Sequence, residues 1–228
     1  MSGLTDLAGG DRPSNDEQIV HAHKTWEESM SRRMDQVRAE IRQRSLAHLA
    51  LCTGAELEGE ALSLPYWGHR VSLSWPDLEA RYVPELEACP VFDQGMLLYY
   101  LQSADGIELA DRWIGYRELP DGAFYNQAFQ GYSGKRVASH FNDDLDRFHA
   151  AARHLEGFQL PSLAPAAYAF TPLPKIRLAM AFWPGDEDFP SRASVLFDAN
   201  ASHYMTTDGL ALLGSGLARR ILDADLPE

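Results

Sequence analysis

The segment 197–208 gathers side chains that can bind an anion or transfer a proton. It joins the end of an expected strand to the start of the last expected helix. Unpaired backbone amides and the positive end of the helix dipole favour an anion at such a start. The side-chain donors around this point are Ser202, His203, Tyr204, Thr206 and Thr207. The segment therefore predicts a pocket for a carboxylate, phosphate or propionate-like group, with His203 as a hydrogen-bond donor, proton shuttle or metal ligand.

The same residues also have a purely structural interpretation. Thr206 or Thr207 can simply cap the helix, since threonine hydroxyls ordinarily accept hydrogen bonds from the first free amides. His203 and Tyr204 would then pack beneath the loop. In this interpretation the segment holds no ligand.

A third interpretation makes the segment part of an enzyme. His203 would act as a general acid or base, oriented by Asp198, and Tyr204 or Tyr125 would be a second donor. Asp198 lies five positions before His203 across an expected chain turn, so a contact between the two is feasible. The catalytic candidates are therefore His203, Asp198 and Tyr204.

The block 113–129 is a second place where ligand-binding side chains gather among aromatic residues. Arg117 can grip an acidic group through two parallel hydrogen bonds, and Tyr125 can line the same wall. Trp183, at the end of another expected strand, completes the ligand-binding candidates. The alternative is that Arg117 meets surface partners while the aromatic residues fill the core.

Three consecutive carboxylates, Asp186 to Asp188, could hold a hard cation such as magnesium or calcium. Consecutive side chains rarely converge on one ion, however, so a solvated acidic turn is the preferred interpretation. His140, Asp143 and Asp144 share one helix turn but are expected on a solvated face. No metal site is predicted, and the sequence indicates no particular cofactor. The glycine-rich phosphate loops, the zinc-protease motif and the nucleophile-elbow motif are all absent.

The overall charge limits the classes of partner. The 228 residues include 20 basic and 33 acidic side chains, a net charge of −13. Such a surface repels phosphate backbones and anionic lipid head groups, so neither nucleic acid nor membrane is an expected partner. The two cysteines, Cys52 and Cys89, form no metal-binding pair, and the N-terminus lacks a signal-peptide pattern. We expect a cytoplasmic protein.

The N-terminal part is expected to be helical. Its apolar side chains recur at helical spacing: Ile19, Trp26, Met30, Met34, Val37 and Ile41. The segment 14–54 is too long for one ordinary helix, so a break is expected near residues 29–31 or Ser45, with Gly54 as the end. This stripe either packs into the core or docks a protein partner, which would make the chain an adaptor.

The remaining elements predict an α+β fold. Strands are expected within 61–75, 175–183 and 194–198, forming one antiparallel sheet. Residues 113–119 could add a strand. Helices at 16–52, 135–156 and 207–222 are expected to flank the sheet, with the last one packed on it. Residues 1–13 are expected to form a disordered tail and 14–228 a single domain, with a helical segment 14–54 before a core 55–228.

Several blocks of sequence occur in an order and spacing that resemble a known family. They include Ala104-Asp105-Gly106, Trp113-Ile114 through Arg117-Glu118-Leu119-Pro120, Trp183 through Pro190, and Val195 through Tyr204. Together they are similar to DUF3786, a prokaryotic family of unknown function, over about residues 45–222. Some members carry an iron–sulfur domain ahead of this one, in anaerobes that use corrinoid or one-carbon chemistry. This chain has no cysteine cluster there, so the resemblance implies no such role for it.

These observations rank three hypotheses. The first is a binding or accessory module for a small anionic ligand or cofactor, held where the strand ending at Asp198 meets the last helix. The second is an enzyme that uses His203 as general acid or base. The third is a protein–protein adaptor that uses the N-terminal helices.

Overall fold

Two separate antiparallel sheets carry the strands of residues 33–225, the part of the chain that the computed structural model describes. The α+β class is therefore confirmed. The single sheet expected from 61–75, 175–183 and 194–198 is wrong, because 61–75 forms its own sheet. An alternating pattern shows which face of a strand is buried but does not identify the neighbouring strand.

The first sheet has four strands in sequence order, with the central hairpin packed under a helix. Its strands are β1 Glu56–Glu58, β2 Ala61–Tyr66, β3 His69–Ser74 and β4 Ala80–Val83. Tyr66 pairs with His69, so the hairpin turn consists of only Trp67 and Gly68.

The second sheet has five strands in the order β5-β9-β8-β7-β6. Its strands are β5 Trp113–Gly115, β6 Phe158–Gln159, β7 Ala166–Leu173, β8 Ile176–Trp183 and β9 Arg192–Asp198. The strand considered for 113–119 is three residues long and continues as the 3-10 turn η1, Tyr116–Glu118. A small apolar cluster of Ala164, Ala167 and Ala181 covers part of the second face of β7 and β8.

The last helix follows its expected stripe, whereas the helix at 122–132 was not among those predicted. The helices are α2 Leu46–Thr53, α3 Val91–Ser103, α4 Gly122–Tyr132, α5 Gly134–Phe141, α6 Leu145–His154 and α7 Thr207–Asp223, with the short turn η2 at Ala201–His203. The single helix expected at 135–156 is wrong. Asn142 adopts a φ of 51°, and Asp144 caps α6 by accepting a hydrogen bond from the Arg147 amide at 3.0 Å.

The N-terminal helical segment packs into the core where it is described. Residues 33–41 are helical, and a break follows at Ser45, whose side chain accepts the His48 amide and caps α2. Gly54 ends α2 with a φ of 68°, as expected. Met34, Val37 and Ile41 are all buried. The rest of the stripe and the 1–13 tail lie outside the described residues.

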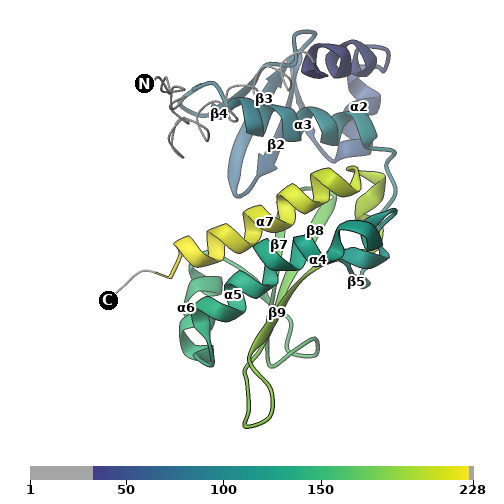
Figure 1. The fold of residues 1–228 in the computed structure, drawn as a ribbon. Coiled ribbons are helices and arrows are strands. Elements are labelled where there is room, and N and C mark those ends of the chain that lie inside the picture. Colours follow the sequence, from purple (N-terminus) through teal and green to yellow (C-terminus); the bar gives the residue numbers. More distant parts are fainter. Residues whose placement is uncertain (1–32, 226–228) are drawn as a thin grey trace, which may run out of the picture.

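Helix α7 lies between the part of the molecule that contains the first sheet and the part that contains the second, as Figure 1 shows. Leu210, Leu213, Leu217 and Ile221 are buried along one stripe, as expected. Gly214 permits a close approach to α4, since a Cβ there would meet the Phe129 ring at 2.8 Å. No helix among the described residues is both long and apolar enough to cross a membrane.

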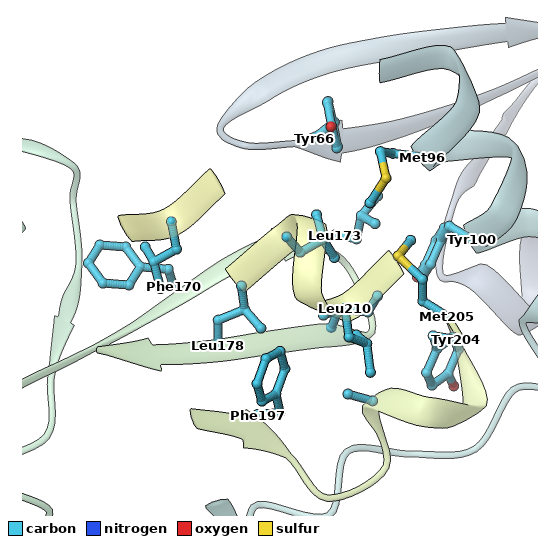
Figure 2. Packing of buried hydrophobic residues seen from close by; sticks show 14 of the residues in the cluster. Tyr66, Met96, Tyr100, Phe170, Leu173, Leu178, Phe197, Tyr204, Met205 and Leu210 are labelled. Carbon is cyan, nitrogen blue, oxygen red and sulfur yellow. The ribbon is translucent and has the colours of Figure 1, made fainter. Parts of the chain in front are cut away.

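One buried core includes residues from both sheets and from α7. Figure 2 shows Tyr66, Met96 and Tyr100 on one side of this core, with Leu173, Met205 and Leu210 facing them. This continuity supports a single domain over the described residues. The proposed boundaries at 13 and 54 stay predictions.

Tyr100 links the first part of the molecule to the second. Its buried hydroxyl donates to the Thr53 carbonyl oxygen at 2.6 Å and accepts the Lys175 amide, from the β7–β8 turn, at 3.1 Å. Both backbone groups therefore depend on one phenol for their pairing.

Tyr100→Phe is expected to destabilise the fold by about 1–3 kcal/mol, because it leaves a buried amide and carbonyl unpaired. Urea unfolding of the full chain measures this loss. Tyr125→Phe is the matched control, since Tyr125 is 60% exposed. Equal stability of the two variants would show that the Tyr100 hydroxyl does not link the two parts.

Candidate functional site

The turn between β9 and α7, where the sequence predicts a site, is held together largely by its own side chains. Tyr204 is fully buried, and its hydroxyl donates to the Ile107 carbonyl oxygen. Burial, with a smaller effect of nearby Asp105 and Glu108, raises the pKa of Tyr204 to about 12. Tyr204 therefore stays protonated at neutral pH and its proton is already committed to the backbone.

Asp198 organises a neighbouring loop rather than His203. The carboxylate is 2% exposed and accepts three backbone amides, from Ala110 at 3.0 Å, Asp111 at 2.9 Å and Asn200 at 2.9 Å. These three amides satisfy the hydrogen-bonding capacity of the buried side chain. Its hydrogen bonds tie the end of β9 to the segment ahead of β5.

The carboxylate that contacts His203 belongs to Asp105. The His203 Nδ1 atom lies 2.6 Å from Asp105 Oδ2, and both side chains are partly exposed, at 39% and 50%. The hydrogen bond from His203 is the main reason that the pKa of Asp105 is lowered from its ordinary value. The expected orienting role of Asp198 is corrected, since residues 98 apart in sequence form the pair.

The threonines at the start of α7 have structural partners. The Thr206 hydroxyl accepts the Gly209 amide at 3.4 Å, which is the capping role considered from the sequence. The Thr207 hydroxyl donates to the Pro120 carbonyl oxygen at 2.6 Å. This second bond brings the helix start next to the 113–129 block. Ser202 is half-buried on η2.

The other predicted ligand-binding residues do not converge as one group. Arg117 lies exposed on η1 and Tyr125 lies exposed on α4, on the same side as the start of α7. Trp183 lies at the far end of the second sheet from Asp198, because it pairs with Arg192 while Leu178 pairs with Phe197. The Arg192 guanidinium stacks on the Trp183 ring at 4.5 Å.

The carboxylates considered as metal ligands have roles within the fold. The Asp186 side chain accepts the amides of Asp188 and Phe189 and so shapes its own loop. Asp143 accepts the Gly185 amide at 2.8 Å. Within residues 33–225 no group of three or more potential ligands could hold a metal ion.

A pocket of about 550 Å³ lies between the first sheet, α3 and α7, and the sequence analysis did not predict it. We call it the arginine pocket, because Arg136, Arg219 and Arg220 line it. Tyr66 and Trp67 from the β2–β3 hairpin and Asp93 from α3 form the opposite wall. Pockets of this size ordinarily accommodate small organic ligands.

Arg220 is the central cation of the arginine pocket. Its guanidinium stacks on the Trp67 ring at 4.0 Å and donates to the Gly216 carbonyl oxygen at 3.4 Å. Burial lowers the pKa of Arg220, and the neighbouring Arg219 adds to that effect. None of the three arginines forms an ion pair with another residue of the described chain.

Asp93 carries the negative charge that lines the arginine pocket, and two tyrosines hold it in place. The hydroxyls of Tyr66 and Tyr82 each donate to one of its oxygens at 2.9 Å. Burial and the adjacent Asp93 raise the pKa of both phenols, so they remain donors. Burial also raises the pKa of nearby Cys89 to about 11, which keeps its thiol protonated at neutral pH.

Weak signals of the arginine pocket exist in the sequence. Arg219 and Arg220 adjoin the apolar stripe of the last helix, and Trp67-Gly68 is a turn with an unexpectedly large residue. Neither signal shows that the hairpin tip and the helix meet, because about 150 residues separate them. A long-range contact of this kind becomes visible only in the fold.

The comparisons with known proteins place the chain in a family without a known activity. The family model for a domain of unknown function, DUF3786, matches residues 45–220, so the chain belongs to that family, as the resemblance in sequence indicated. No curated protein matches the chain. No solved structure matches it either.

Asp105→Asn is expected to reduce the loss of stability in acid. The ionised carboxylate has a lowered pKa in the folded state, so it stabilises the fold above about pH 4 and this contribution is lost as the pH falls. Urea unfolding at about pH 6 and about pH 3 measures the difference. Asp77→Asn, at an exposed position, is the control. Identical pH dependence in wild type and Asp105→Asn would contradict the His203–Asp105 pair.

Proposed function

We propose that this DUF3786 member is a binding module for a small anionic ligand, which it holds in the arginine pocket. The observation that carries the proposal is Arg220, a half-buried cation with no carboxylate partner among the described residues. A buried charge is costly unless it is paired. A bound anion would supply the missing pair.

The charge of the arginine pocket contrasts with that of the whole chain. Three arginines and one aspartate line it, which gives three minus one, or +2, whereas the chain carries −13. An acidic surface repels anions at a distance, so a locally positive recess selects for anions small enough to enter. Planar guanidinium groups match the geometry of carboxylates and phosphates.

An anion in the arginine pocket would be attracted by the arginine side chains and not by the helix dipole of α7. Arg219 and Arg220 lie in the last turns of a helix that ends at Asp223. The helix dipole is negative there and favours cations, so the helix end itself would not attract an anion. The ligand is the same kind as the sequence predicts, but the proposed site is at the opposite end of the helix.

The two free, buried cysteines support a cytoplasmic location for this binding module. Disulfides are rare in reducing compartments, and buried reduced thiols are the usual state of cysteine there. A protein partner that receives or delivers the ligand is compatible with the proposal.

Arg219→Gln and Arg136→Gln are each expected to weaken binding of pyrophosphate or citrate by about 10- to 100-fold, since each removes a charge-assisted hydrogen bond. Isothermal titration calorimetry at low salt measures the affinities. These two arginines are exposed, so their replacement leaves the core intact.

Two further variants locate the bound anion. Gly216 lines the arginine pocket, and a Cβ there would lie 3.4 Å from Arg220 Nη1 and 3.8 Å from Trp67. Gly216→Leu should therefore block binding by crowding this stacked pair, without removing a charge. Arg112→Gln is the control for lost charge outside the pocket. If Arg117→Gln abolishes binding while Arg219→Gln does not, the anion binds at the start of α7 and the proposal is wrong.

A second candidate function is acid–base catalysis at the start of α7. It is favoured by the 2.6 Å pair of His203 and Asp105, in which a partly exposed imidazole is oriented by a carboxylate. Ser202, Thr206 and Arg117 would contact the substrate.

His203→Ala is expected to lower any hydrolytic turnover of nitrophenyl acetate or nitrophenyl phosphate by about 100-fold or more, while the protein stays folded. His154→Ala, another exposed histidine, is the control. Wild-type protein that shows no turnover above buffer, or a His203→Ala variant that retains it, would remove this candidate.

A further inference from the structure

A second pocket, of about 530 Å³, adjoins the arginine pocket on the other side of the Trp67–Arg220 pair. Both pockets are lined by Trp67 and Arg220, so these two side chains form a shared wall. The second pocket lies between the β2–β3 hairpin tip, the end of α6, β7 and α7. We call it the aromatic pocket, for the residues described next.

The aromatic pocket is built from rings and apolar groups. Leu217 and Phe170 are buried in its lining, and Phe158 stands at its edge with 73% of its surface exposed. Apolar surface exposed to water costs free energy, so a ligand that covers the Phe158 ring would gain from its burial. Beside Trp67, Phe158 offers a π face on which a planar ring can stack.

The charge of the aromatic pocket differs from that of the arginine pocket. One arginine, Arg220, and one carboxylate, Glu156, line it, so its formal charge is zero. His69 and His154 add imidazole groups that can hydrogen-bond the polar edge of a ring. An uncharged planar group therefore suits this pocket, and a second anion does not.

Trp67 adopts a backbone conformation that costs free energy. It has a φ of 50° and is followed by Gly68 with a φ of 81°, so both central residues of the two-residue turn lie at positive φ. Asn-Gly is the preferred pair in such turns, and a bulky residue at positive φ is uncommon. The turn holds the Trp67 indole at the wall between the two pockets.

We propose that the ligand is an aromatic anion: a planar ring with a polar edge, joined to a phosphate or carboxylate. The anionic group occupies the arginine pocket and the ring occupies the aromatic pocket, with the Trp67–Arg220 pair between them. This inference rests on the proposed function and adds the chemical class of the ligand.

The test compares three probes by calorimetry on the full chain: inorganic phosphate, naphthol and naphthyl phosphate. Naphthyl phosphate should bind at least 10-fold more tightly than phosphate, because it fills both pockets. Phe158→Ser should reduce naphthyl phosphate to the affinity of phosphate and leave phosphate itself unchanged. Trp67→Asn, in which asparagine suits the turn, should weaken both probes, because Trp67 lines both pockets.

Phe189→Ser is the matched control, since Phe189 is 70% exposed, close to the value for Phe158, and lies outside both pockets. Two results would overturn the aromatic class alone, provided that phosphate binding still depends on Arg219. The first is an equal affinity for naphthyl phosphate and phosphate, and the second is an unchanged affinity for naphthyl phosphate in Phe158→Ser. The proposed function is overturned as well if neither phosphate nor naphthyl phosphate binds, or if Arg219→Gln leaves their affinities unchanged.

Discussion

The burial of α7 between the two parts of the molecule is the constraint on which the rest of the structure depends. Its apolar stripe packs against the second sheet and the neighbouring helices, and its exposed edge meets the β2–β3 hairpin. The hairpin tip is tied to the same region, because the Trp67 amide donates to the Pro172 carbonyl oxygen at 3.0 Å. Both pockets exist because a rigid helix cannot fill the space beside a twisted hairpin completely.

This arrangement explains why a cation is partly buried at that junction. Arg220 follows the apolar stripe on α7 closely enough that its aliphatic part is covered, while its guanidinium reaches the Trp67 ring. The stacking compensates for part of the lost hydration of the guanidinium. Asp93, whose oxygens each accept one tyrosine hydroxyl, interacts electrostatically with Arg220 without forming an ion pair with it.

The two candidate sites lie at opposite ends of α7 and differ in how they are built. At its start, the hydroxyls of Thr206, Thr207 and Tyr204 are hydrogen-bonded to backbone groups. The partly exposed His203–Asp105 pair could still act on a substrate. Near the end of α7, Arg219 and Arg220 form no ion pair within residues 33–225. Unpaired charge in a recess is the stronger sign of a ligand, since a fold gains nothing from leaving it unpaired.

The sequence by itself determined the α+β class, the last helix and the breaks at Ser45 and Gly54, because periodicity and caps are local properties. It also identified His203 as a candidate, since residue type and position are visible without a fold. The tertiary structure alone decided that Asp105 contacts His203, that the strands form two sheets and that Trp67 meets Arg220. Those pairings depend on how distant segments pack, and hydrophobic patterns show that a face is buried without specifying its partner.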